Sequence, residues 1–438
     1  MSFPRYPKYK DSGVEWLGQV PEHWQLKPLY GSAVERYESN AGMVEDNLLS
    51  LSYGRIVQKD ISSNDGLLPE SFETYQIVRP GDIVFRLTDL QNDKRSLRSA
   101  LVEENGIITS AYLAVTPCGL DSRYMSYLFR AYDVTKVFYS MGGGLRQSMK
   151  FADMKRLPTL LPPLPEQTRI AAFLDQETEK LDKLVTEQQR LMALLKEKRQ
   201  AVISHAVTKG LNPQAALKPS GIEWLGDVPA HWNVRRLKYV SPEITVGIVV
   251  EPSKYYAAEG IPALRSLNIA PGAVVLDNLV FISAEANELH TKSKLNAGDL
   301  VAVRSGQPGT TAVIPPELDG CNCIDLIIIR KPAVGCERFL CWYLASDVAV
   351  MQFSVGSGGA IQQHFNVSTA MDLVVTVPPA KEQESIVAFI NNETTKLDTL
   401  TAEAQRAIDL LQERRTALIS AAVTGQIDVR QLTEKEAA

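Results

Sequence analysis

The chain lacks the features that mark membrane and secreted proteins. No apolar run approaches the roughly 18 residues that a membrane-spanning helix needs, and the first residues hold no hydrophobic stretch of the kind found in a secretory signal. Its five cysteines are an odd number in a chain of 438 residues, which argues for reduced thiols and against a disulfide framework. We therefore expect a cytoplasmic protein with no membrane partner.

Recognisable catalytic and metal-binding patterns are also missing. There is no phosphate-binding loop, no dinucleotide-binding glycine motif, no Asn/Asp-Pro-Pro-Tyr/Phe tetrapeptide of amino-methyltransferases and no Asp…Glu-x-Lys nuclease arrangement. The spacing of Cys321, Cys323, Cys336 and Cys341 fits no common zinc pattern, so we expect small, mostly buried side chains there rather than a metal site. Gly142–Gly144 alone is a weak signal, open to a flexible turn or a phosphate cradle. We expect no catalytic residue, no metal and no cofactor in this chain.

What the chain does have is a long internal repeat. Ser12–Trp24 returns as Ser220–Trp232 with ten of 13 positions identical, and Glu166–Thr208 returns as Glu382–Thr424 with 24 of 43 identical. Between the copies lie two segments of more than a hundred residues that look nearly unrelated. A repeat of this length fixes the architecture before any motif does. Two similar frames with different inserts suggest one scaffold that presents two different readers.

The longer repeat is typical of a helix in both copies. It has no glycine or proline, it is rich in good helix formers, and Gly210 or Gly425 follows it. Apolar residues recur at coiled-coil spacing, so we expect the two helices to pair with each other in antiparallel fashion. The alternative is that each helix packs separately on its own globular half. The residues expected in the helix pairing are Leu174, Leu181, Leu184, Leu195, Ile390, Leu397, Leu400 and Leu411.

The shorter repeat is rich in aromatic residues and turns. Its four tryptophans are Trp16, Trp24, Trp224 and Trp232. They suit either a docking surface or plugs at the junctions between helix and globular part, and we favour plugs.

The inserts read as mixed α+β segments with mostly strand signals. Shared landmarks, such as Gly81–Val84 with Gly298–Val301, suggest one fold that has drifted. The expected fold class is therefore α+β: two mixed α/β globular domains joined by two long antiparallel coiled-coil helices, with an internal pseudo-twofold repeat. Expected strands include Leu48–Ile56, Gly81–Leu87, Ile107–Thr116, Leu300–Arg304 and Leu326–Arg330.

Neither insert has an excess of positive charge. The chain has a net charge of −5, and the residues from Gln25 to Leu161 hold 16 basic and 16 acidic side chains. Those from Asn233 to Val377 hold 11 basic and 13 acidic ones. This is the wrong balance for a protein that binds DNA alone. Any nucleic-acid surface must be a local stripe, or a partner must supply the missing positive charge.

The loops of the inserts nevertheless carry side chains suited to base edges. Arg and Lys contact guanine, and Asn and Gln contact adenine. Each one alone is as well explained as an ordinary solvated side chain, but as sets they favour DNA. The candidates are Arg55, Lys59, Arg86, Lys94, Arg95, Arg98, Arg146, Gln147 and Lys150 in the first insert, and Arg265, Arg304, Gln307, Gln362, Gln363 and His364 in the second.

Three sets of motifs resemble one family. They are the repeated Glu-Trp-Leu-Gly-x-Val-Pro-x-His-Trp, the helix starts at Pro162–Leu174 and Pro378–Ile390, and the closing Val423–Arg430. The chain resembles the specificity (S) subunits of type I restriction–modification systems over almost its whole length. The doubled motifs are specific, while the inserts match only in outline.

The resemblance implies two target recognition domains, each of which reads one half of a split site in double-stranded DNA. It implies helices that set the gap between the half-sites and hold the modification (methyltransferase) subunits. S-adenosylmethionine would bind to those subunits, and ATP and Mg to separate restriction subunits. The implied segments are 1–24 (conserved segment), 25–165 (first recognition domain), 166–209 (central helix), 210–232 (linker and repeated segment), 233–381 (second recognition domain), 382–425 (second helix) and 426–438 (tail).

Two other functions stay open. A self-contained DNA-modifying enzyme is disfavoured, because neither insert holds a cofactor loop or a catalytic tetrapeptide. A coiled-coil scaffold that binds proteins or small ligands would use the inserts as interaction modules. Because the inserts are the variable part of the family, no base-contacting residue carries over from the resemblance.

Overall fold

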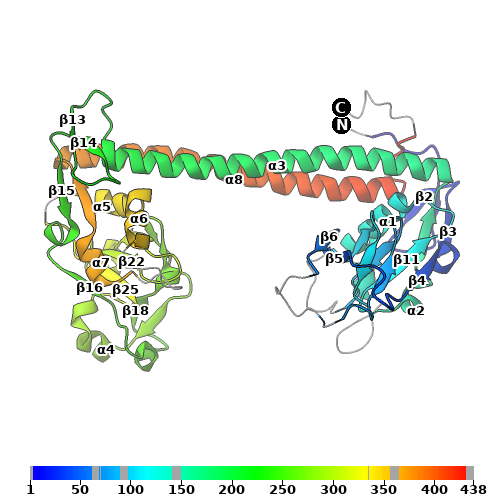
Figure 1. The fold of residues 1–438 in the computed structure, drawn as a ribbon, viewed down its shortest axis with the longest axis horizontal. Coiled ribbons are helices and arrows are strands. Elements are labelled where there is room, and N and C mark those ends of the chain that lie inside the picture. Colours follow the sequence, from blue (N-terminus) through cyan, green and yellow to red (C-terminus); the bar gives the residue numbers. More distant parts are fainter. Residues whose placement is uncertain are drawn as a thin grey trace. The chain divides into compact units, whose positions relative to one another are not determined.

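The computed structural model describes residues 3–61, 69, 71–88, 97–140, 149–333, 335–355 and 365–430. Its contacts divide the chain into two compact units, Met1–Gln189 with Arg406–Ala438, and Arg190–Gln405. Each unit holds one globular domain and part of each of two long helices (Figure 1). Both globular domains combine sheets with helices, so the expected α+β class is confirmed.

The two long helices are α3 (Leu164–Lys209) and α8 (Ala380–Val423). Neither helix contains glycine, and neither contains a proline beyond its first turn, so nothing interrupts the backbone hydrogen bonds. Gly210 and Gly425 follow them with φ of 78° and 74°, the left-handed conformation that ends many helices and that glycine adopts without strain. Neither these nor any other described helix is long and apolar enough to cross a membrane.

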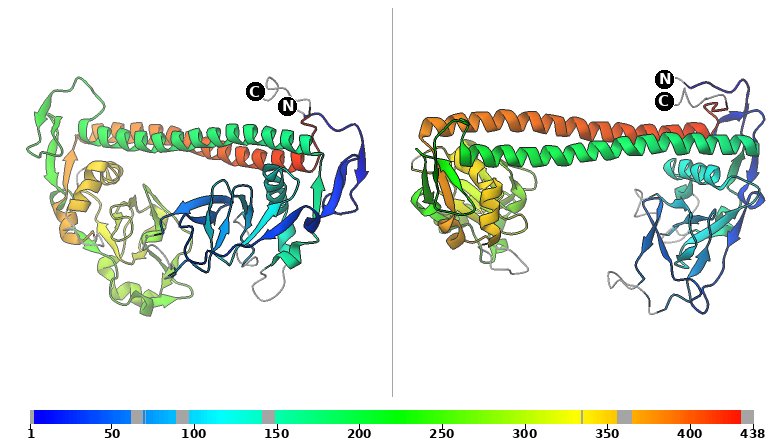
Figure 2. Two further views of the ribbon diagram at one scale, coloured as in Figure 1. Left: turned by 45° about the vertical axis from the view of Figure 1, so that its right-hand side comes forward. Right: turned by 45° about the horizontal axis from the view of Figure 1, so that its top comes forward.

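The two helices pack against each other in opposite directions, as expected (Figures 1 and 2). In the first unit Asp182 of α3 accepts a hydrogen bond from Arg415 of α8, with 3.1 Å between Oδ1 and Nε. In the second unit Arg199 of α3 pairs with Asp398 of α8. These two ion pairs are copies of each other, because Asp398 follows Asp182 and Arg415 follows Arg199 by the same 216 residues. The antiparallel pairing is therefore built into the repeat.

The apolar seam is narrower than the heptad pattern predicted. Leu174, Leu181, Leu195, Ile390 and Leu397 are buried, and Leu411 is half-buried. The prediction was wrong for two residues of the second row, because Leu184 and Leu400 are 50% and 46% exposed. A strict heptad assigns both apolar rows to the partner helix. Here the second buried row faces the globular domain instead, as at Thr178, whose hydroxyl lies 3.3 Å from that of Tyr127.

Short strands build the first globular domain into two four-stranded sheets. They are β4 (Ala33–Arg36), β5 (Leu48–Ser52), β6 (Arg55–Lys59), β7 (Gln76–Val78), β8 (Ile83–Phe85), β9 (Ser99–Leu101), β10 (Gly106–Ile108) and β11 (Leu113–Pro117). The strand orders are β4-β11-β8-β9 and β6-β5-β10-β7, and all neighbours are antiparallel except β5 and β10. Helix α1 (Ser122–Val134) packs on this core, with the rings of Phe129 and Phe85 4.9 Å apart. A one-turn helix, α2 (Phe151–Met154), follows before α3.

The second globular domain also has two four-stranded sheets, and one of them has the same order of equivalent strands as in the first domain. Its strands are β16 (Ile244–Val246), β17 (Tyr256–Ala257), β18 (Ile261–Leu264), β21 (Val280–Ile282), β22 (Leu300–Val303), β23 (Thr311–Val313), β24 (Asn322–Cys323) and β25 (Leu326–Ile329). They form sheets ordered β16-β25-β22-β23 and β17-β21-β18-β24, again with one parallel pair, β18 and β24. The domain adds a hairpin, β19 (Ile269–Ala270) with β20 (Ala273–Val274), and the helices α4 (Ala284–Leu289), α5 (Glu337–Leu344), α6 (Asp347–Val355) and α7 (Val367–Asp372).

Two expected strands divide in the structure. The run Leu48–Ile56 is the hairpin of β5 and β6, because Tyr53 and Gly54 turn the chain with φ of 46° and 76°. The run Ile107–Thr116 is split between β10 and β11. Apolar composition identifies both runs as strand-forming but does not reveal a two-residue turn that contains only one glycine.

The repeated aromatic segments lie where a globular domain joins the helices. In the first copy, β1 (Tyr9–Asp11) and β2 (Gln19–Pro21) form a small hairpin, and the following β3 (Gln25–Pro28) pairs with β12 (Pro158–Leu161), directly before α3. In the second copy, β13 (Leu217–Pro219) and β14 (Asp227–Pro229) form the hairpin, and β15 (Asn233–Arg236) pairs with β26 (Val374–Val377), directly before α8. Trp24 and Trp232 are fully buried there, as plugs should be. Trp16 and Trp224 are 42% and 37% exposed, so only one tryptophan of each copy plugs its junction.

The two junctions differ in their hydrogen bonds. In the first, the buried Glu166 carboxylate accepts hydrogen bonds from the Tyr6 hydroxyl at 2.6 Å and from Trp24 Nε1 at 3.0 Å, and His23 Nε2 lies 2.8 Å from it. In the second, Glu382 contacts His231 at 2.7 Å, and the buried Trp232 Nε1 has no hydrogen-bond partner among the described residues. Glu166 thus satisfies two buried donors that its counterpart does not.

This difference predicts unequal effects of matched substitutions. Glu166→Ala leaves the Tyr6 hydroxyl and the Trp24 indole N–H buried and unpaired, at about 1–3 kcal/mol for each group. Glu382→Ala removes a partly exposed contact and should lower the free energy of unfolding by less than about 1 kcal/mol. Urea denaturation followed by tryptophan fluorescence measures both. Equal losses would show that the Glu166 hydrogen bonds contribute nothing extra.

Candidate nucleic-acid interface

In the first domain, two of the predicted reading segments leave and re-enter the described structure side by side. Segment 89–96 follows β8 and segment 141–148 follows the short helix at Val137–Ser140. The amide of Met149 donates to the carbonyl of Leu87 at 3.0 Å, and the amide of Arg86 donates to the carbonyl of Arg98 at 2.9 Å. These bonds join both ends of segment 89–96 to the residue that follows segment 141–148, and we call these joined ends the stems.

The second domain has an equivalent pair of stems. The turn from Arg304 to Thr310 links β22 and β23, closed by a hydrogen bond of 2.9 Å from the amide of Val303 to the carbonyl of Thr310. The amide of Phe365, directly after segment 356–364, donates to the carbonyl of Arg304 at 3.0 Å. The turn requires Gly309, because a Cβ there would lie 1.9 Å from the ring of Phe353.

Seven of the predicted contact residues lie outside the described residues. They are Lys94, Arg95, Arg146, Gln147, Gln362, Gln363 and His364. The glycine-rich stretch Gly142–Gly144 also lies outside the described residues. The described stems place the ends of these segments together in each domain.

Arg98 is a correction to the sequence prediction. Its side chain is fully buried and cannot present a guanidinium to DNA. Nη1 donates to the carbonyls of Thr88 at 3.1 Å and Arg86 at 3.4 Å, and Nε donates to the Tyr139 hydroxyl at 3.4 Å. Arg98 therefore contacts the stems from inside the domain.

Two predicted residues of the second domain are also engaged within it. The Arg304 guanidinium is 21% exposed, lies 2.5 Å from Asp325 and donates to the carbonyl of Phe365 at 3.3 Å. Arg265 is half-buried and donates to the carbonyl of Asn278 at 2.7 Å. Asn268, three residues further along, is fully buried and donates to the backbone of its own loop, so it is not available to read a base.

Five predicted residues are exposed. Arg86, Lys150 and Gln307 lie at or next to the stems, while Arg55 and Lys59 lie on β6. Arg55 is directed toward the helices rather than the stems, because its Nη2 lies 3.3 Å from Asp182 of α3. The structure thus brings some of the predicted residues together and leaves the β6 pair apart from them.

The β5–β6 hairpin is held by a residue that sequence reasoning missed. Arg130 of α1 donates to the carbonyls of Gly54 at 2.5 Å and Ser99 at 2.9 Å. Burial lowers the pKa of Arg130 to about 10, although Asp133 nearby favours its charged form. Nothing in the sequence distinguishes this arginine from the others of α1, because its partners are backbone carbonyls distant in the chain.

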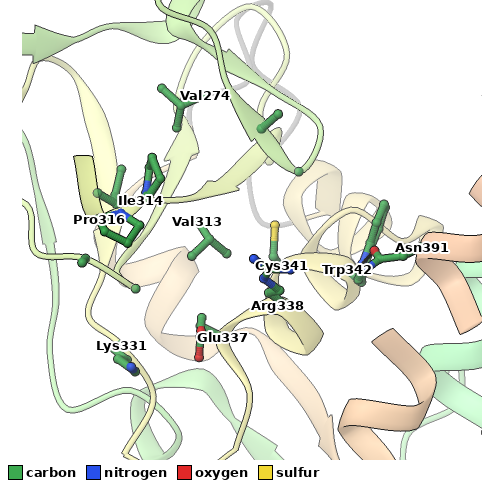
Figure 3. A pocket seen from close by; sticks show the side chains of 15 residues that line it. Val274, Val313, Ile314, Pro316, Lys331, Glu337, Arg338, Cys341, Trp342 and Asn391 are labelled. Atoms are coloured by element: carbon green, nitrogen blue, oxygen red, sulfur yellow. Dashed lines mark hydrogen bonds between the residues drawn. The ribbon is translucent and has the colours of Figure 1, made fainter. Parts of the chain in front are cut away.

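The cysteines of the second domain belong to its core. Cys321, Cys323 and Cys341 are buried, and Cys341 borders a hollow of about 610 Å³ beside α5 that also exposes Lys331, Glu337 and Arg338 (Figure 3). Among the described residues, no three His, Cys, Asp or Glu side chains gather as a metal-binding group.

Comparison with known proteins shows what the chain is similar to. A search against protein-family models found no match. The MjaX specificity subunit, a type I restriction enzyme protein of Methanocaldococcus jannaschii, is 22% identical over 94% of this chain and 96% of its own. The EcoKI specificity subunit of Escherichia coli K12 is also 22% identical, over 94% of this chain and 90% of its own. The chain is thus similar over almost its whole length to specificity (S) subunits of type I restriction enzymes.

Solved structures share the fold of this chain. One, from work on complex assembly and conformational transition of the type I R-M system, has a TM-score of 0.69 at 17% identity and covers 92% of this chain and 98% of that chain. The HsdS subunit of Thermoanaerobacter tengcongensis has a TM-score of 0.52 at 17% identity, covering 95% and 99%. At this identity the likeness concerns the fold.

The burial of the cysteines predicts a strong difference in their reactivity. Burial raises the pKa of Cys321 and of Cys341 to about 12, and raises that of Cys323 further, from an ordinary value of 9.0. At pH 8 we expect maleimide to modify the exposed Cys118 at least about 100-fold faster than these three, because the thiolate is the reacting form. Peptide mass spectrometry measures the rates, and urea-unfolded protein, with every thiol open, is the control.

The same pKa shifts predict a loss of stability in alkali. The folded state keeps these thiols protonated above the pH at which the unfolded chain releases their protons. Their contribution to stability is therefore complete below about pH 9 and declines as the pH rises toward 12. In the maleimide experiment described above, rapid labelling of Cys321 or Cys323 in the native protein would contradict the burial of these thiols.

Proposed function

We propose that this S subunit reads a split site in double-stranded DNA, one half-site with each globular domain, as part of a type I restriction–modification complex. The observation that carries the proposal is that the same four-stranded sheet occurs in both domains, and that backbone hydrogen bonds join two loop regions at its edge each time. Two segments on shared stems form one surface, and different side chains on the same stems would read different bases. The described candidates for DNA contact are Arg55, Lys59, Arg86, Lys150 and Gln307, with Arg265 and Arg304 partly exposed.

The chemistry is assigned to partner chains. The sequence has no methyltransferase tetrapeptide and no ATP-binding loop, so this chain acts as a non-catalytic recognition subunit. S-adenosylmethionine would be bound by modification subunits, and ATP with Mg by restriction subunits. The nearly neutral inserts fit this division, because partners would add the positive charge that DNA binding needs.

The helix pair offers a place for those partners. Leu184 and Leu410 of the first unit are 50% and 65% exposed, and Leu194 and Leu400 of the second are 53% and 46% exposed. The repeat relates Leu184 to Leu400 and Leu194 to Leu410 by 216 residues. The ion pair Asp182–Arg415 places Leu184 and Leu410 within about one turn of each other along the pair, and Arg199–Asp398 does the same for Leu194 and Leu400.

These leucines face away from the globular domains. At about 100° per residue, Leu184 is turned about 200° from Asp182, which contacts the first domain. Leu400 is turned about 180° from Asn391, which accepts a hydrogen bond from Trp342 of the second domain. Each unit therefore exposes one leucine pair on the outer side of the helices. We assign one modification subunit to each pair, and we assign to the helices the role of setting the gap between half-sites.

The decisive experiment maps DNA methylation in cells that express the S subunit with its modification partners. We expect a two-part motif with a fixed gap. Replacing residues 25–165 by the matching segment of a relative should change one half-site and leave the other intact, because the two domains share few residues that couple them. A chimera in which both halves change would show that the domains do not read independently. A single continuous motif, or methylation by the purified chain alone, would favour one of the other functions.

A second prediction concerns the leucine pairs. Leu184→Asp and Leu400→Asp should each remove one copy of the modification subunit, because a carboxylate in an apolar interface is strongly unfavourable. The double variant should bind none. Native mass spectrometry of the assembled complex counts the copies.

Leu289→Asp is the matched control. Leu289 is 69% exposed on α4, within the second globular domain, so this change should leave both copies bound. Full assembly by the double variant would exclude the leucine pairs as docking sites.

A further inference from the structure

Arg98 contacts described residues directly before segment 89–96 and close before segment 141–148 of the first domain. Its guanidinium bonds to the carbonyl of Thr88, the last described residue before segment 89–96, and to the hydroxyl of Tyr139, just before segment 141–148. Its own backbone precedes β9, on the return from the first segment. One side chain thus contacts the entry of both segments and stands at the exit of one of them.

The burial of this arginine indicates a structural purpose. A charged side chain is almost never fully buried without partners, because desolvation is unfavourable. Here carbonyl oxygens and a hydroxyl receive its N–H groups, and the buried Asp133 accepts a hydrogen bond from its backbone amide. Burial raises the pKa of Asp133, while this amide and the neighbouring cations oppose that shift. The planar guanidinium suits the position, because it directs several donors to fixed points, which a lysine ammonium does not.

The second domain reaches the same result with a different residue. Arg304 lies at the end of β22, and its Nε donates to the carbonyl of Phe365, the first described residue after segment 356–364. Its Nη1 pairs with Asp325 in the turn between β24 and β25, where Asp325 has a φ of 52°. The counterpart of Arg98 by strand position is Thr310, just before β23, so the second tie is not an inherited copy of the first.

We propose that Arg98 and Arg304 are positioning residues that hold together the described residues from which the reading segments of each domain start or end. The proposal rests on the function proposed above and refines it. A residue that reads one base affects one position of the site, and a residue that binds a phosphate affects all sequences alike. A tie between two reading segments affects several positions of one half-site together, and it leaves the number of phosphate contacts unchanged.

The test uses the full S subunit assembled with its modification subunits and a DNA library randomised at both half-sites. Tyr139→Phe removes the hydroxyl that receives Arg98 Nε but keeps the ring. We expect methylation selectivity to fall about fivefold at two or more positions of the first half-site, the effect of one lost hydrogen bond. The second half-site should be unchanged, and so should the dependence of binding on salt. Arg98→Lys should have the same pattern and a larger effect.

Asp325→Asn and Arg304→Lys give the mirror experiment. They should relax several positions of the second half-site and leave the first intact. Tyr132→Phe is the matched control in the first domain, because the buried Tyr132 hydroxyl donates to the carbonyl of Pro158 at 2.9 Å, away from the stems. It lowers stability in the same way but should not alter selectivity.

The outcomes separate this inference from its foundation. If the wild-type complex yields no two-part motif, the proposed function fails, whatever the variants do. If the motif is present, relaxation at a single position would make Arg98 or Arg304 a base-reading residue, and a shallower salt dependence would make it a phosphate contact. Unchanged selectivity in Tyr139→Phe and Asp325→Asn would overturn the positioning role, even where Arg98→Lys fails to fold.

Discussion

The pairing of α3 with α8 is the constraint on which the rest of the structure depends. Neither helix can bury its apolar row alone, and each row is completed by residues about two hundred positions away. The core of the first globular unit includes Leu418, Ile419, Ala422 and Val423 from the end of α8. The core of the second includes Ile203, Ala206 and Val207 from the end of α3. Each unit is therefore assembled from both halves of the chain, and its globular domain packs on a surface that neither half supplies by itself.

The stems explain how two domains with nearly unrelated sequences keep one plan. The amide of Met149 bonds to the carbonyl of Leu87, and that of Phe365 to the carbonyl of Arg304. Both bonds join backbone groups, which every residue except proline supplies in full. Side chains between the stems are free to differ as long as strands such as β8 and β22 remain. Under the proposed function, this freedom would let the segments between the stems read different bases in the two domains.

The sequence predicted the large elements well and the roles of single polar residues poorly. Composition and the glycines that follow the helices were enough to predict the long helices. Leu174 and Ile390 are buried, as their spacing predicted. The prediction for Leu184 was wrong because periodicity shows that a helix has two apolar rows, but it does not show which neighbour each row contacts. The prediction for Arg98 was wrong for a related reason. An arginine in a polar loop looks like a surface residue until the structure shows which carbonyl groups surround it. Its partners, Thr88 and Tyr139, have no sequence signature.

The internal contacts of these arginines also limit the positive charge that the molecule can offer to DNA. Several cations of the inserts that looked available for DNA have partners within the protein: Arg55 contacts Asp182, Arg304 contacts Asp325, and Arg98 is buried against carbonyl groups. The described surface can therefore offer even less positive charge to phosphates than the net charge of −5 suggests. Non-specific attraction to DNA depends on the number of such contacts. Under the function proposed above, the arginines that hold the ends of the reading segments contribute to base recognition, and the attraction to the DNA backbone would come from the chains that assemble on the helices.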